Sequence, residues 1–186
     1  KANKHFYAGE LKQAKKEYRQ LINIYSRDTI YCGEQLKYLD WSNMIFQYHV
    51  KDKILDSIRV LDLSDTHLSV LPKEIGLLKN LKRLHLSNSK LLALPKEIGQ
   101  LKNLEYLDLG FNNLPILPKE IGELKQLELL TLRNNSLSVL PKEIGELKLL
   151  TFLDLSDNSL SSLPKEIGQL KLLKRLDLDD NSLLDL

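Results

Sequence analysis

The chain has 186 residues, 42% of them hydrophobic and 28% charged, so a sizeable core can form and general disorder is excluded. Its 27 basic and 25 acidic residues leave a formal net charge of +2, which gives no electrostatic reason to expect a nucleic-acid partner. The single cysteine, Cys32, excludes an intramolecular disulfide framework and a CxxC metal site. No apolar run approaches the length of a membrane span, so membrane insertion is not expected.

Residues 1–57 are predicted to form a helical N-terminal cap over the first strand of the domain that follows. Apolar or small residues recur there at helical spacing: Leu11, Ala14, Tyr18, Leu21 and Ile22. Together with Gly9, which lies between two candidate helices, Leu11, Ala14, Tyr18 and Ile22 resemble the second half of a tetratricopeptide repeat, although Ser26 replaces the proline that is usual in that family. A further helix is expected from Ile30 to about Val50. A separate peptide-binding groove is the alternative, and a single helical pair would form only a small one.

Residues 58–186 form the second predicted domain, an array of 23-residue repeats with five full units and a 14-residue remnant. A typical unit reads LTFLDLSDNSLSSLPKEIGQLKL. The units begin at Ile58, Leu81, Leu104, Leu127, Leu150 and Leu173. Leucine holds the fourth and sixth positions of every unit. This period-two alternation predicts a short strand whose leucines point inward.

The LPKEIG segment of each unit predicts a short helical turn. Proline suits the first helical position because its missing N–H would have no partner within the helix there. Glycine one turn later allows a tight reversal. No unit can bury its leucines alone, so the units are expected to stack with strands about 4.8 Å apart in one parallel sheet. Because strands stack more closely than helical segments, the sheet is expected to line the concave side of a curved array.

Asparagine holds the ninth position of four units: Asn112, Asn135, Asn158 and Asn181. An inward asparagine can use both its amide N–H groups and its carbonyl oxygen to satisfy backbone groups where the chain turns. Thr66 and Ser89 stand at this position in the first two units, so we expect a weaker ladder of hydrogen bonds there.

The pattern L-x-x-L-x-L-x-x-N matches the leucine-rich-repeat family unit for unit, and with LPKEIG it resembles the short bacterial subtype found in pathogenic spirochaetes. The resemblance implies an α/β fold: a right-handed leucine-rich-repeat solenoid with a curved parallel sheet inside and short helical segments outside. It also implies a non-enzymatic protein-binding module, used in host contact by a secreted or cell-surface protein. A cytoplasmic location fits the residues equally well.

The third position of each unit faces outward on the concave side and holds Val60, Arg83, Tyr106, Leu129, Phe152 and Arg175. Tyr106, Leu129 and Phe152 are neighbours in this column, with Phe111 near one end and Arg133 close by. Exposed aromatic residues beside an arginine are typical of protein-binding hot spots. We therefore predict that these five residues contact a protein partner. The alternative is that the side chains on this face only cover one another.

The fifth position is largely acidic and includes Asp108, Asp154 and Asp177. Adjacent strands would bring Asp154 and Asp177 to roughly 5 Å, a like-charge pair that raises one pKa or attracts a cation. Solvated acids and recognition of a basic partner group are the other interpretations. All three aspartates are counted among the candidate contacts.

The sequence contains no P-loop, GxSxG, HExxH or GxGxxG motif, and its four histidines form no metal-ligand pair at helical spacing. We therefore expect no catalytic residues, no metal and no cofactor, and we interpret Cys32 as structural.

The sixth unit stops at Leu186, before its LPKEIG segment, and no polar capping sequence follows. One interpretation is that a capping tail was removed or is disordered. A second hypothesis is structural: the chain forms a homodimer through an uncapped C-terminal edge around Leu176, Leu178, Leu183 and Leu186.

Overall fold

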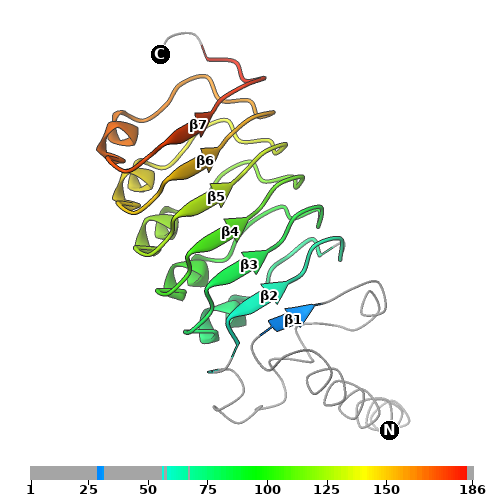
Figure 1. Cartoon of the computed structure of the whole chain (residues 1–186). Helices are drawn as coiled ribbons and strands as arrows, with labels where there is room; N and C mark the ends of the chain where they lie inside the picture. The colour runs from blue at the N-terminus through cyan, green and yellow to red at the C-terminus, as the bar shows by residue number, and fades with distance from the viewer. Residues whose placement is uncertain (1–28, 32–55, 57, 67, 184–186) are drawn as a thin grey trace, which may run out of the picture.

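The computed structural model describes residues 29–31, 56, 58–66 and 68–183 (Figure 1). Seven parallel strands form one sheet in chain order: β1 (Thr29–Tyr31), β2 (Val60–Asp62), β3 (Arg83–His85), β4 (Tyr106–Asp108), β5 (Leu129–Thr131), β6 (Phe152–Asp154) and β7 (Arg175–Asp177). Five short 3-10 helices follow strands β2 to β6: η3 (Lys73–Leu77), η4 (Lys96–Gln100), η5 (Lys119–Glu123), η6 (Lys142–Glu146) and η7 (Lys165–Gln169). Figure 1 shows the strands stacked along one side of the array and the 3-10 helices stacked along the other.

Equivalent residues of consecutive repeats lie side by side. Leu84 of β3 pairs in register with Leu107 of β4, and Leu107 pairs with Leu130 of β5. All three leucines are fully buried, as are the leucines two residues later in each unit. The predicted parallel sheet with inward leucines is thereby confirmed. Each repeat buries its apolar side chains against its neighbours, which is why the repeats are stable only as a stack.

Proline lies one residue earlier than the sequence analysis predicted. Pro118 precedes η5 in an extended conformation, with φ of −67° and ψ of 145°, and the helix begins at Lys119. The carbonyl oxygen of Pro118 accepts the first helical hydrogen bond from Ile121 N–H at 3.0 Å. Proline therefore enforces the extended entry and supplies the first acceptor, and the other four prolines of this motif have the same geometry.

The glycine of LPKEIG is required for a reason other than the predicted tight reversal. Among the described residues no glycine has a positive φ. A Cβ on Gly122 would instead lie 2.6 Å from the carbonyl oxygen of Glu143 in the next repeat. Gly99 and Gly145 are equally crowded, whereas a Cβ on Gly168 would meet no atom within 4 Å. Glycine thus permits the close approach of neighbouring 3-10 helices.

The sheet begins before the first repeat. Thr29 of β1 pairs in parallel with Val60 of β2, so residues 30 and 31 are strand, and the helix predicted to start at Ile30 is wrong at these two residues. The remainder of the predicted N-terminal helical cap, including its resemblance to a tetratricopeptide half-repeat, lies outside the described residues.

Candidate partner-binding face

The outward residues of the central strands form a continuous apolar row, which consists of Tyr106, Leu129 and Phe152. Tyr106 pairs in register with Leu129, and Leu129 pairs with Phe152, so the three side chains stand on adjacent strands of one sheet face. Each of the three is half-buried. Arg83 and Arg175 occupy the next register positions at the two ends of the row. The structure therefore brings together three of the five residues predicted to contact a partner.

The two aromatic members of the apolar row are packed against neighbouring side chains. The ring of His85 lies 4.8 Å from the ring of Tyr106, centroid to centroid. The guanidinium carbon of Arg175 lies 5.4 Å from the centre of the Phe152 ring. These contacts hold both rings in place before any partner binds, and a preorganised ring loses less conformational entropy on binding. The sequence analysis did not single out His85 or Arg175, although the 23-residue period places Arg175 beside Phe152.

The Tyr106 hydroxyl group has a perturbed environment. Burial raises its pKa above 10.0, and the neighbouring carboxylate of Asp108 raises it further, while Arg83 acts in the opposite direction. Tyr106 is therefore uncharged at neutral pH and presents a hydroxyl donor beside an apolar ring. A side chain of this kind suits an interface whose core is apolar and whose margin is polar.

Phe111 stands apart from the apolar row and is paired with Arg133. It lies beyond the C-terminal end of β4 and 52% of its surface is exposed. The guanidinium carbon of Arg133 lies 5.8 Å from the centre of the Phe111 ring, and Arg133 Nε donates to Asp157 Oδ2 at 3.0 Å. The backbone of Phe111 is left-handed, with φ of 55°. Five other repeats hold aspartate or asparagine in this conformation at the equivalent position: Asp65, Asn88, Asn134, Asp157 and Asp180.

The left-handed conformation is unfavourable for a bulky side chain, whereas aspartate and asparagine tolerate it. Phe111 is therefore the strained member of an otherwise favourable series. Because the Phe111 side chain is exposed, burial in the core does not offset this backbone strain. Such an outlier is a reason to look for a binding role.

Three aspartates of the fifth position accept hydrogen bonds from the backbone at the ends of their strands. Asp108 Oδ1 accepts a hydrogen bond from Gly110 N–H at 3.0 Å, and Asp154 Oδ1 accepts one from Ser156 N–H at 3.0 Å. Asp177 Oδ1 accepts from the N–H of Asp179 at 3.3 Å. Each aspartate thereby satisfies a backbone donor two residues after itself, where its strand ends. One carboxylate oxygen of each is occupied in this way.

The predicted like-charge effect at Asp154 and Asp177 is not what the structure shows. The two residues are register partners on β6 and β7, as expected. However, Arg175 Nη2 donates to Asp177 Oδ2 at 3.1 Å, and this hydrogen bond, helped by the N–H of Asp179, lowers the pKa of Asp177. Within the described residues there is also no group of three or more histidine, cysteine, aspartate or glutamate side chains that could hold a metal ion. Arg175 thus accompanies Asp177 within its own strand.

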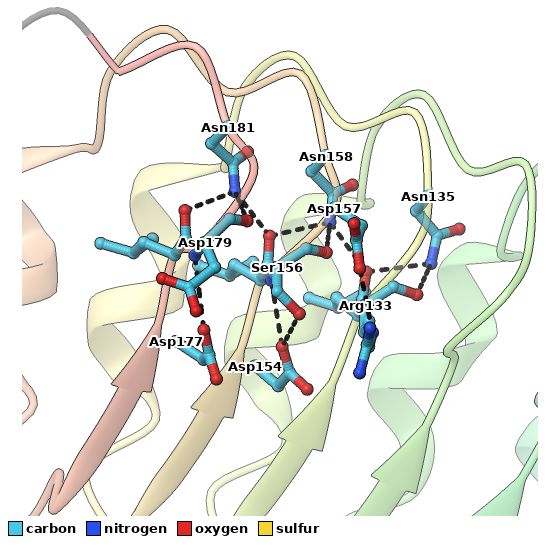
Figure 2. A network of polar contacts seen from close by, with 12 residues as sticks. Arg133, Asn135, Asp154, Ser156, Asp157, Asn158, Asp177, Asp179 and Asn181 are labelled. Atoms are coloured by element: carbon cyan, nitrogen blue, oxygen red, sulfur yellow. Dashed lines mark hydrogen bonds and ion pairs between the residues drawn. The ribbon is translucent and has the colours of Figure 1, made fainter.

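The four asparagines form a ladder of hydrogen bonds just beyond the C-terminal ends of the strands, and Figure 2 shows three of them, Asn135, Asn158 and Asn181. Asn158 Nδ2 donates to the carbonyl oxygens of Leu132 at 2.9 Å and Leu155 at 3.0 Å, and its Oδ1 accepts from Leu137 N–H at 3.0 Å. Asn112, Asn135 and Asn181 make the equivalent bonds. Each asparagine joins two consecutive repeats, so the ladder sets the spacing of the strands that carry the apolar row.

The first two repeats hold a reduced version of this ladder. Ser89 Oγ donates to the carbonyl oxygen of Leu63 at 2.8 Å, and Thr66 Oγ1 donates to the same oxygen at 2.7 Å. A hydroxyl has a single hydrogen to donate, whereas an amide has two.

A second set of exposed apolar side chains lies outside the sheet face, after the ninth position of the first four repeats, whereas the fifth repeat has Ser161 and Ser162 there. Its large members are 52–64% exposed: Val70, Leu92, Ile116 and Val139. The sequence analysis did not single out these residues. A repeating apolar residue that follows the inward leucine is the signal that could have identified them.

Comparison with known proteins identifies related repeats. The family model described as "Leucine-rich repeat region" matches residues 35–134 and 116–185. No curated protein sequence matches the chain. Within the described residues, no helix has the length and apolar character needed to cross a membrane.

Three solved structures illustrate the similarity. The ectodomain of the plant membrane receptor kinase GASSHO1/SCHENGEN3 from Arabidopsis thaliana, in complex with CASPARIAN STRIP INTEGRITY FACTOR 2, is 34% identical, with a TM-score of 0.64 over 82% of this chain and 17% of that chain. A TDR receptor is 30% identical, with a TM-score of 0.63 over 70% of this chain and 23% of that chain. A leucine-rich-repeat protein of Leptospira interrogans is 32% identical, with a TM-score of 0.40 over 73% of this chain and 52% of that chain. The chain thus spans less than two thirds of the length of each.

Proposed function

The chain belongs to the leucine-rich-repeat family, and from this premise we propose that it is a non-enzymatic protein-binding module whose partner contacts the apolar row Tyr106, Leu129 and Phe152. The sequence analysis expects this face to be the concave side of the array. The single observation that carries the proposal is the register of the three residues on adjacent strands, outward and half-buried.

Three further observations support a binding role. Both aromatic rings contact neighbouring side chains. The Tyr106 ring lies 4.8 Å from the His85 ring, and the Phe152 ring lies 5.4 Å from the guanidinium carbon of Arg175. Phe111 keeps an exposed aromatic ring in a strained backbone conformation next to Arg133. A structurally similar receptor ectodomain is described as a complex with a protein factor. Aromatic side chains and arginine at the centre of a face are the residues that contribute most to protein interfaces.

The experiment compares capture of partner proteins by three forms of the chain. One form is wild type, the second carries Tyr106→Ala with Phe152→Ala, and the third carries Ile116→Ala. Ile116 is a matched control because it is apolar and 57% exposed but lies outside the sheet face. We expect proteins that are retained by wild type and by the Ile116 variant and are lost with the double variant. Equal retention by a correctly folded double variant would contradict the proposal.

A role in host contact, with secretion or display on the cell surface, is part of the same proposal and rests on the resemblance of the LPKEIG unit. Proteolysis of intact source cells tests it. Cleavage of the chain without cell lysis supports surface display, and full protection together with absence from the culture medium contradicts it.

A further inference from the structure

We propose that the sheet face selects an extended peptide segment in which a large apolar side chain stands next to lysine or arginine. This inference rests on the proposed function and adds the chemistry of the partner. It is carried by the arrangement of carboxylates around the apolar row.

Carboxylates flank the apolar row along both of its long sides. Glu105 and Glu128 come immediately before strands β4 and β5, and Asp108 and Asp154 end strands β4 and β6. The three segments 105–108, 128–131 and 151–154 contain no lysine or arginine. An apolar side chain placed on the row is therefore surrounded by negative charge on both sides.

Much of this negative charge is not neutralised within the described part of the chain. Lys82 Nζ lies 2.6 Å from Glu105 Oε1, and both side chains of this ion pair are exposed to solvent. Glu128, Asp108 and Asp154 form no ion pair with another described residue. The backbone N–H of Gly110 and that of Ser156 each engage Oδ1 of an aspartate and leave Oδ2 of Asp108 and Asp154 open to a partner.

The negative charge is local to this face. The five segments that contain the 3-10 helices and the following turn hold ten lysines against seven glutamates: 73–79, 96–102, 119–125, 142–148 and 165–171. The whole chain carries a net charge of +2. The excess of negative charge is confined to the three central strands, because Arg83 and Arg175 lie at the two ends of the row. A cationic group of a partner is therefore attracted beside the middle of the row.

The geometry favours an extended segment. Strands β3 to β6 are paired on both sides, so their backbone groups are engaged and the partner is recognised by side chains. The row crosses three strands spaced about 4.8 Å apart, and an extended chain places alternate side chains about 6.6–6.8 Å apart on one face. The row is therefore about 9.6 Å long, and about four consecutive residues of such a segment span it, with two alternate side chains on the row. A lysine or arginine beside them reaches Asp108 or Asp154, and next to Asp108 it lies close to the Tyr106 ring, where a cation is attracted. The Phe152 ring already has the guanidinium of Arg175 over it.

The test is selection from a displayed library of random peptides on the full chain. Three variants are compared with wild type: Tyr106→Ala with Phe152→Ala, Asp108→Asn with Asp154→Asn, and Glu97→Gln with Glu120→Gln. Asparagine retains an Oδ1 acceptor for the backbone N–H, so the aspartate variant removes charge and preserves the turn. The glutamate variant removes the same charge from the opposite side of the array and is the matched control.

We expect wild type to enrich peptides that combine an aromatic or large aliphatic residue with lysine or arginine. The aspartate variant should bind these peptides about five- to tenfold more weakly, and the glutamate variant should bind them as wild type does. Enrichment of acidic or uncharged peptides that still require Tyr106 and Phe152 would overturn this inference and leave the proposed function standing. Peptides that bind the Tyr106 and Phe152 variant as well as wild type, or no enrichment at all, would overturn both.

Discussion

The guanidinium carbon of Arg133 lies 5.8 Å from the centre of the Phe111 ring, and the backbone of Phe111 is left-handed. Arg133 is itself held by Asp157 at 3.0 Å, so the ring, the guanidinium and the carboxylate form a connected set across three repeats. A left-handed conformation costs about 1–2 kcal/mol for a residue with a bulky side chain. An exposed cation–π contact returns about 0.5–1 kcal/mol. The balance leaves Phe111 unfavourable for folding.

Replacement of Phe111 by asparagine is therefore expected to raise the free energy of unfolding by about 0.5–1 kcal/mol, because asparagine tolerates the left-handed conformation. Urea denaturation measures the change. The reciprocal variant Asn134→Phe places a bulky side chain at the equivalent position, where φ is 51°, and should destabilise the chain. A Phe111→Asn variant that is less stable than wild type would contradict the assignment of strain to this residue.

Gly122→Ala is expected to lower the free energy of unfolding by about 1–3 kcal/mol, because overpacking forces neighbouring backbone to move. The added Cβ would lie 2.6 Å from a carbonyl oxygen of the next repeat. Gly168→Ala is the matched control, since it lies in the same motif but a Cβ added there would meet no atom within 4 Å. Thermal or urea unfolding should separate the two variants clearly. Equal effects would mean that the close approach of consecutive 3-10 helices does not explain the glycine.

Asn158→Ala is expected to lower the free energy of unfolding by about 1–3 kcal/mol, because an unsatisfied buried polar group costs roughly that much. The substitution removes the acceptor of the Leu137 N–H, while the carbonyl oxygens of Leu132 and Leu155 each lose one of two amide donors and keep Asn135 and Asn181. Asn113→Ala changes an exposed asparagine two repeats earlier and should have an effect within about 0.5 kcal/mol. Urea denaturation distinguishes them, and a small effect at Asn158 would argue against the ladder as a source of stability.

The lowered pKa of Asp177 predicts a dependence of stability on pH. The pKa lies below its ordinary value of 3.8, mainly because Arg175 donates to the carboxylate. A lowered aspartate pKa contributes stability that is present above the pKa of the unfolded state and is lost as pH falls through that of the folded state. Asp177→Asn should therefore be less stable than wild type at about pH 7 and equally stable near pH 2.

Urea midpoints at the two pH values measure this difference, and Asp180→Asn serves as control. Asp180 is exposed and has a left-handed backbone that asparagine accepts equally well. A difference between wild type and Asp177→Asn that persists unchanged in acid would show that the ion pair with Arg175 is not its cause.

Much of the architecture could be predicted from the 23-residue period. The period identifies which residues occupy equivalent positions, and because consecutive repeats stack in register, it also identifies neighbours in space. Tyr106, Leu129 and Phe152 are register partners in the structure, as the period indicated. The four asparagines likewise occur where one repeat meets the next.

Other features depend on distances and backbone angles that no repeat pattern contains. The glycine of LPKEIG is explained by a contact with the following repeat, and the strain at Phe111 by its φ angle. A raised pKa, one of the interpretations of the like-charge pair, is contradicted at Asp177, because Arg175 donates to this carboxylate from two positions away on the same strand. The strand at Thr29–Tyr31 lies before the repeats, so the 23-residue period could not predict it.

By itself the sequence determined the stack of repeats, the inward leucines and the order of side chains along each row, because a 23-residue unit buries its leucines only against identical neighbours. Only the tertiary structure decided which atoms meet across those neighbours. Hydrogen bonds, ion pairs and close contacts between repeats act over a few ångströms and depend on the local backbone, and a shared period leaves that backbone free to differ from one repeat to the next.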